Sequence, residues 1–327
     1  MSPLTEAIAA CREDFCRGFQ RLRAEHALHP AGASASAIFE SAADSARAVA
    51  AECLPLGVAV VMHLYPLCVL RCIPLPWWSA ANIRRIKLLR DIDHHSLLLA
   101  NAGSERTTGT QAPVKAARTG DGYRVDGTYE YVSLSHVADV VLFSAPLRGS
   151  PNSVFCAADL RGESVRIGPP RFSGSMKLSD TCSVTFDNHH VPADRCIVVP
   201  GESALTCMAQ YQRSWFHLLL GEAYLARLEA LHRQWALPRA AEFVASLNEL
   251  VFLKKYSLCL LNEASSPSVV ESLSRVTAAM KLRISWLAQA TAATMRSRDE
   301  SAASELGFIS RQPTSDDRIL RSIGAAA

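Results

Sequence analysis

The stretch that decides the fold is residues 125–133, which read VDGTYEYVS. Two turn signals accompany it: Gly120-Asp121-Gly122 stands before Tyr123, and Asp126-Gly127 follows Val125. Gly and Asp favour the backbone conformations of tight turns, so the pattern predicts a short strand with a turn at each end. Four further β-type runs follow, separated by Pro and Gly, at residues 137–145, 153–157, 183–186 and 196–199. We therefore predict a compact antiparallel β-domain over residues 97–201.

Helical patterns flank this β-domain on both sides. Residues 36–51 carry Ala, Ile and Phe at helical spacing, and Ser79 is placed to cap a further helix. Residues 203–298 contain three apolar stripes at helical spacing, with Pro238 and Pro267 at the joints. The sequence therefore predicts an α+β chain with three domains: an N-terminal helical domain (1–96), the central β-domain (97–201) and a C-terminal helical bundle (202–327).

The composition is that of a globular protein. Of the 327 residues, 49% are hydrophobic and 20% are charged, which excludes a disordered chain, a collagen or a coiled coil. Lys and Arg number 34 and Asp and Glu number 31, an excess of +3. Binding to nucleic-acid phosphates needs a concentrated basic face, so we do not expect nucleic acid as the partner.

Ten cysteines are scattered along the chain without a CxxC pair. In a chain of this length the pattern predicts reduced thiols that are buried like small hydrophobes, in a cytoplasmic protein. Cys68 and Cys72 are spaced to share a helix face, but only His63 stands near them, and these are too few ligands for a metal site. We therefore predict no metal site.

One apolar run tests the alternative of a membrane protein. Residues 53–70 contain no Asp, Glu, Lys or Arg, a length that touches the lower limit for a membrane span. Pro55, His63 and Pro66 lie inside the run, and Arg71 follows it directly. We therefore predict a buried core helix here and no membrane partner.

The β segment resembles the middle domain of the acyl-CoA dehydrogenase superfamily. Residues 119–123 are similar to the Gly-Asp-x-Tyr hairpin of that family, and residues 125–133 to its Leu-Asn-Gly-x-Lys-x-(Trp/Phe)-Ile-(Ser/Thr) motif. Ala138-Asp139 matches the Ala-Asp before the next strand, and residues 186–192 are similar to Phe-x-x-Val-x-Val-Pro. The resemblance is specific over residues 97–201 and weaker in the C-terminal helices. It implies an acyl-CoA dehydrogenase-like fold.

The resemblance also implies FAD and assigns four residues to it. Ser133 falls on the Ser/Thr whose hydroxyl donates toward the flavin ring edge, and Tyr131 on the aromatic residue that packs against the ring. Asn101 falls on the Thr-Glu-Pro loop that faces the flavin. Arg233 falls on the arginine that pairs with the pyrophosphate of FAD across the dimer, but the Phe-Gly of that motif is missing here. The resemblance therefore leaves open whether the flavin has been lost.

The family's catalytic base has no counterpart in this sequence. Most members carry a carboxylate shortly after a C-terminal Arg-Asp segment, whereas this sequence reads Arg321-Ser322 and ends at Ala327. A minority carry it in a Glu-Arg pair, where this sequence has Gln212-Arg213, and an amide cannot take a proton at neutral pH. The catalytic residue is therefore unknown. The candidate substitutes are Glu105, Glu202, Glu222 and Glu229; nothing in the sequence selects one of them, and a solvated helix-face acid is the simpler explanation.

Three functions are compatible with these observations. The first is a biosynthetic flavin-dependent oxidoreductase, a CH–CH dehydrogenase or a monooxygenase, acting on an acyl thioester, a carrier-bound intermediate or a related small molecule. The second is a flavin-free cyclase or isomerase on the same scaffold. The third is a non-catalytic subunit that pairs with a paralogue in a heteromeric dehydrogenase. The family's helical domains pair, so each implies an oligomer, a homodimer or homotetramer where no paralogue is involved.

Overall fold

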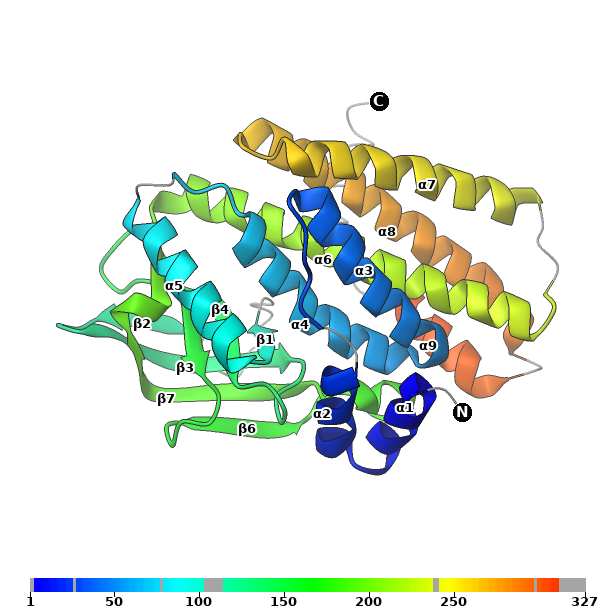
Figure 1. Ribbon diagram of the computed structural model, residues 1–327, viewed down its shortest axis with the longest axis horizontal. Coiled ribbons are helices and arrows are strands. Elements are labelled where there is room, and N and C mark those ends of the chain that lie inside the picture. The colour runs from blue at the N-terminus through cyan, green and yellow to red at the C-terminus, as the bar shows by residue number, and fades with distance from the viewer. Residues whose placement is uncertain are drawn as a thin grey trace.

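The computed structural model describes residues 3–25, 28–76, 79–102, 114–237, 241–296 and 299–311. Helices come first and last along the chain, and the strands lie between them (Figure 1). The first helices are α1 (Pro3–Glu13), α2 (Phe15–Glu25), α3 (Ala35–Glu52), α4 (Leu54–Cys72) and α5 (Ala80–His95). The last are α6 (Gly201–Gln234), α7 (Ala241–Asn262), α8 (Pro267–Met295) and α9 (Glu300–Arg311). This order confirms the predicted α+β class.

Within the described residues, the strands form two four-stranded sheets. One has the order β1 (Leu99–Ala102), β4 (Val140–Pro146), β5 (Ser153–Asp159), β8 (Cys196–Val199). The other has the order β2 (Lys115–Arg118), β3 (Gly122–Val132), β7 (Cys182–Pro192), β6 (Val165–Pro170). All the pairings are antiparallel except that of β1 with β4, which is parallel. The expectation of a purely antiparallel unit was wrong for this pair, because β2 and β3 intervene in the other sheet and make the connection a crossover.

The predicted turn at Asp126-Gly127 is instead a bulge inside β3. The register between β3 and β7 shifts between Val125 and Gly127, and Gly127 has a φ of 120°, which favours glycine. Asp126 Oδ1 accepts a hydrogen bond from the N–H of Asn188 on β7 at 2.7 Å. The prediction of a turn was therefore wrong. Asp126 and Gly127 instead accommodate one extra residue of β3 in its pairing with β7.

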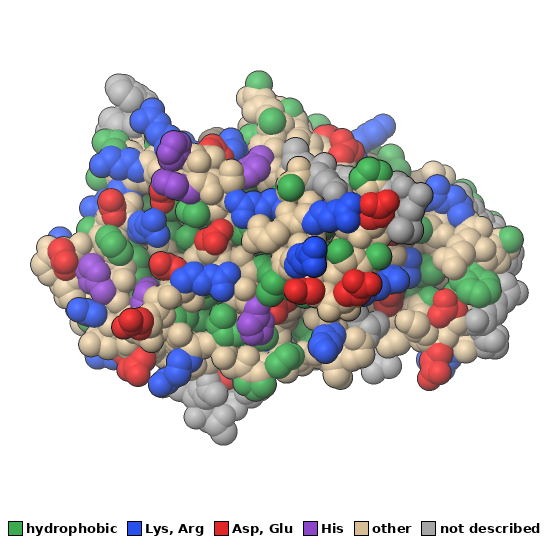
Figure 2. Space-filling view, turned by 60° about the horizontal axis from the view of Figure 1, so that its bottom comes forward, with side chains coloured by type: hydrophobic (Ala, Val, Ile, Leu, Met, Phe, Trp, Pro, Cys, Tyr) green, Lys and Arg blue, Asp and Glu red, His purple; other side chains and the backbone are tan. Residues whose placement is uncertain are grey.

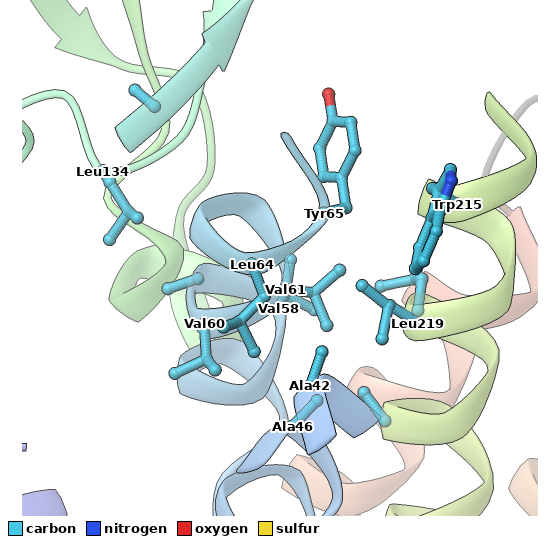
Figure 3. Packing of buried hydrophobic residues seen from close by; sticks show 14 of the residues in the cluster. Ala42, Ala46, Val58, Val60, Val61, Leu64, Tyr65, Leu134, Trp215 and Leu219 are labelled. Atoms are coloured by element: carbon cyan, nitrogen blue, oxygen red, sulfur yellow. The ribbon is translucent and has the colours of Figure 1, made fainter. Parts of the chain in front are cut away.

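Helix α4 is the centre of the helical core. Figure 3 shows it between Ala42 and Ala46 of α3, Trp215 and Leu219 of α6, and Leu134 in the turn after β3. By length and composition it is apolar enough to cross a membrane, but 89% of its most apolar window is buried inside the protein. The prediction of a buried core helix is confirmed. The predicted cap of α5 is confirmed as well, because Ser79 Oγ accepts from the N–H of Asn82.

Six of the ten thiols are buried as predicted, and the other four are partly or fully exposed. All ten cysteines are free. Cys68 is fully buried, and His63 has its two ring nitrogens bonded to backbone groups, so this pair forms no metal site. Cys16 on α2 and Cys259 on α7 are exposed.

Candidate functional site

Three elements meet beside Asn101, the first of the predicted flavin residues. Asn101 lies on β1, and its side chain is hydrogen-bonded to Tyr65 on α4. The Tyr65 ring contacts Phe216 on α6, with ring centroids 5.4 Å apart. In Figure 3 the Tyr65 hydroxyl points away from the apolar packing around α4. Burial raises the pKa of Tyr65, so the phenol stays neutral and keeps its proton to donate.

Tyr131 presents an aromatic surface at the end of β3. Its side chain is 39% exposed, and its ring lies against Phe172, with centroids 6.0 Å apart. Phe172 in turn meets Phe308 of α9 edge-on, at 5.4 Å. We call these three residues the aromatic cluster. A strand, a loop and a helix therefore converge on one partly open aromatic surface.

Ser133 is buried at the head of a chain of hydroxyls. Ser179 donates to the carbonyl of Met176 at 2.9 Å, so its oxygen accepts from Thr181 at 2.8 Å. The oxygen of Thr181 in turn accepts from Ser133, also at 2.8 Å. The proton of Ser133 is therefore directed to Thr181. To donate to a flavin, Ser133 would have to break its hydrogen bond with Thr181. Its flavin role therefore remains a prediction.

The segments that carry Asn101 and Ser133 are bonded to each other. The N–H of Leu98 donates to Asp139 Oδ2 at 2.8 Å, and the N–H of Asp139 donates to the carbonyl of Leu98 at 2.9 Å. Leu98 stands directly before β1, and Asp139 ends the turn that starts at Ser133. These bonds place the start of β1 beside the turn that follows β3.

Arg233 lies apart from this group. It is exposed near the end of α6, and its Nε donates to the carbonyl of Glu229 on the same helix at 3.4 Å. It stands 17 positions beyond Phe216, about 26 Å along the helix. Within one chain the structure does not bring Arg233 to the other three residues. The resemblance gives Arg233 a role across a dimer, and that role does not require Arg233 to lie near the other three residues of its own chain.

Each buried glutamate in the described residues is ion-paired. Glu130 pairs with Arg171, Glu222 with Arg47 and Lys254, and Glu305 with Arg227. Burial raises the pKa of Glu305, and Arg227 opposes that shift. A cation beside a carboxylate stabilises its charged form and so weakens it as a proton acceptor.

The four carboxylates considered as substitute bases differ in their exposure to solvent. Glu202 and Glu229 are exposed, and Glu105 lies outside the described residues, as does the segment around Arg321. Glu222 is 6% exposed, so the interpretation of this residue as a solvated surface acid was wrong. Its partners come from α3 and α7, far away in sequence, and the pattern of α6 alone gives no sign of them.

Comparison with known proteins comes from structures alone, because no family model and no curated protein sequence matches this chain. The FMN-bound dibenzothiophene monooxygenase TdsC from Paenibacillus sp. A11-2 is 18% identical, with a TM-score of 0.70 over 94% of this chain and 88% of that chain. KijD3 in complex with FMN and a dTDP-linked amino-keto sugar is 15% identical, with a TM-score of 0.76 over 95% and 86%. Methanesulfinate monooxygenase MsuC from Pseudomonas fluorescens is 15% identical, with a TM-score of 0.71 over 98% and 95%.

These structures share the acyl-CoA dehydrogenase-like fold, and this chain has it as well. The fold that the motif in residues 125–133 implied is therefore confirmed. At 15–19% identity the likeness establishes the fold alone. The function has to be argued from this chain's own residues.

Proposed function

We propose that this chain is a flavin-dependent oxidoreductase of the monooxygenase type, acting on a small molecule rather than desaturating an acyl thioester. One observation carries the proposal: each buried glutamate in the described part of the chain is neutralised by an arginine or a lysine. Removal of a proton next to a thioester carbonyl needs a positioned, free general base. Gln212, at one of the family's base positions, is an amide.

The residues present fit a flavin. The aromatic cluster offers a partly open surface on which a planar ring can stack. Asn101 offers an amide on β1, next to Tyr65, and the exposed guanidinium of Arg233 from a second copy of the chain can pair with phosphate. A bound flavin would supply the redox chemistry, and the chain's part is to position it, exclude water and orient the substrate. The Tyr65 hydroxyl is a neutral, buried hydrogen-bond donor next to Asn101. We assign it to substrate orientation.

Small-molecule substrates agree with the structural neighbours. TdsC has been crystallised with indole and KijD3 with a nucleotide sugar. We propose a substrate of comparable size from secondary metabolism, and leave the choice between FMN and FAD to the experiment below. The free thiols support a cytoplasmic location.

We further propose an oligomer. Four large apolar side chains of α7 and one of α8 are 41–67% exposed, and such a patch is typical of a protein interface. They are Val244, Val251, Phe252, Tyr256 and Trp286. Figure 1 shows α7 on the outer side of the bundle, where a second copy has access to it.

The test is a flavin titration followed by an oxidation assay. The full chain is titrated with FMN and FAD in turn, and binding is followed by the visible absorbance and fluorescence of the flavin. We expect saturable binding, weakened about tenfold by Tyr131→Ala because the stacking surface is lost. Ile83→Ala, which removes an exposed apolar side chain from α5 outside both the aromatic cluster and the proposed interface, is the control and leaves affinity unchanged.

The loaded protein is then given reduced flavin, O₂ and indole as a probe, and separately octanoyl-CoA with an electron acceptor. We expect oxygenated product from the first assay and no turnover in the second. Rapid desaturation of octanoyl-CoA contradicts the monooxygenase proposal. Failure to bind either flavin contradicts the flavin proposal as a whole and favours the flavin-free enzyme or the partner subunit.

A further inference from the structure

A cluster of nitrogen, oxygen and sulfur donors lies where the turn after β3 meets the start of β7. Ligand atoms of His136, Asp180 and Cys182 all lie within 4.8 Å of one another. His136 Nδ1 is 2.6 Å from Asp180 Oδ1 and 3.9 Å from Cys182 Sγ. Because 44 residues separate His136 from Asp180, no short sequence motif reveals the group.

We propose that His136, Asp180 and Cys182 bind a divalent transition-metal ion of the zinc class. Imidazole nitrogen, carboxylate oxygen and thiolate sulfur are the donors that zinc takes. Around a tetrahedral zinc, with bonds of about 2.0 Å to N and O and about 2.3 Å to S, neighbouring donors lie about 3.3–3.6 Å apart. The two separations above differ from those values by less than about 1 Å. Small side-chain rotations therefore suffice to form the site.

A hydrogen bond holds the Asp180 carboxylate in position, and the donor cluster is open to solvent on the His136 side. The N–H of His136 donates to Asp180 Oδ2 at 2.7 Å, which fixes the carboxylate and leaves Oδ1 turned toward the other donors. Such outer hydrogen bonds orient ligands in metal sites. Cys182 is fully buried, whereas the His136 side chain is 48% exposed, so an ion reaches the site from solvent.

Charge balance is also satisfied. One carboxylate and one thiolate, which forms when the metal displaces the thiol proton, neutralise a doubly charged ion. Arg161 lies outside the donor triangle, where its guanidinium donates to the carbonyl of His136 at 3.0 Å. The fourth coordination position remains for water.

A bound ion would stiffen the site described above. Thr181 lies between two of the ligands and accepts the hydrogen bond of Ser133. The metal proposal nonetheless stands on its three donors and does not depend on flavin binding. It departs from the sequence-based expectation of no metal site, which considered only short spacings.

The probe is Co²⁺, which reports thiolate coordination by a charge-transfer band. The reduced, chelator-treated full chain is titrated with Co²⁺, and difference spectra are recorded against Mg²⁺. We expect one ion per chain and a thiolate band that Zn²⁺ abolishes by displacement. Ten free thiols also offer adventitious sites, so the assignment depends on variants.

His136→Ala and Cys182→Ser remove one ligand each and are expected to abolish the band and to weaken binding at least tenfold. Cys259→Ser removes an exposed thiol on α7 and leaves the band unchanged. Because the His136 side chain is half-exposed, His136→Ala keeps the test valid if Cys182→Ser fails to fold. A band that survives His136→Ala, or the absence of any band, overturns the proposal and leaves the group as a hydrogen-bonded His–Asp pair beside a buried thiol.

Discussion

Replacing Glu222 by alanine is expected to lower the free energy of unfolding by about 3–5 kcal/mol. Glu222 is buried on α6, where it accepts hydrogen bonds from Arg47 of α3 and, at 3.2 Å, from Lys254 of α7. Removing the carboxylate leaves two cations in a partly buried site with one fewer counter-charge. Breaking such a network by removing one partner costs far more than the network itself contributes, because the remaining charges stay desolvated.

The two cations keep other partners, which sets the lower end of that range. Arg47 also bonds Asp44, at 2.5 Å, and Lys254 lies 3.2 Å from Glu40. The measurement is urea denaturation followed by circular dichroism at neutral pH. Glu229→Ala, which removes an exposed acid from the same helix, is the matched control and is expected to change stability by less than about 0.5 kcal/mol. A Glu222→Ala loss no larger than the control's would mean that the network is already solvated.

The sequence predicted the architecture better than the contacts that build the site. The motif in residues 125–133 and the apolar periodicities reflect local backbone preferences. Because these preferences persist in the folded protein, they predicted the order of helices and strands correctly. The Asp126-Gly127 dipeptide has the same composition in a turn and in a bulge. Only the pairing of β3 with β7 decides between them.

The candidate site shows the same limit. Asn101, Tyr131 and Ser133 were found because a motif marks them, but their partners were not. Tyr65 belongs to the apolar run of residues 53–70. Its hydroxyl was the one feature of the sequence that could have indicated a role in the site. Phe172 and Thr181 stand in segments that carry no pattern of their own. Glu222 shows the general reason: whether a helix acid is solvated or paired depends on residues far away in the sequence.

His63 is expected to make the protein lose stability as the pH falls below neutrality. The residue is fully buried on α4, and burial lowers its pKa to about 4. Its Nε2–H donates to the carbonyl of Leu28 at 3.0 Å, and its Nδ1 accepts from the N–H of Leu99 at 3.0 Å. A proton on Nδ1 would break the second bond, which holds the start of β1 and hence the strand of Asn101. The folded state therefore resists protonation.

The unfolded chain takes this proton near pH 6.5, so acid favours unfolding over the interval from about 6.5 down to about 4. At about 1.4 kcal/mol per pH unit, His63 alone contributes a loss of about 2 kcal/mol at pH 5 and about 3 kcal/mol by pH 4. Above pH 6.5 its contribution is fully present. Other buried histidines such as His217, whose pKa burial also lowers, add to the total slope.

The contribution of His63 is isolated by comparison with His63→Gln, whose amide can both donate and accept without titrating. Denaturation of the two proteins at pH 7.5 and pH 5 should show that the wild type loses about 2 kcal/mol more than the variant between the two pH values. His94→Gln, which alters an exposed histidine on α5, serves as the control and should keep the wild-type slope. Equal losses in wild type and His63→Gln would mean that the imidazole already gains its proton in the folded protein, and that β1 is held independently of the tautomer of His63.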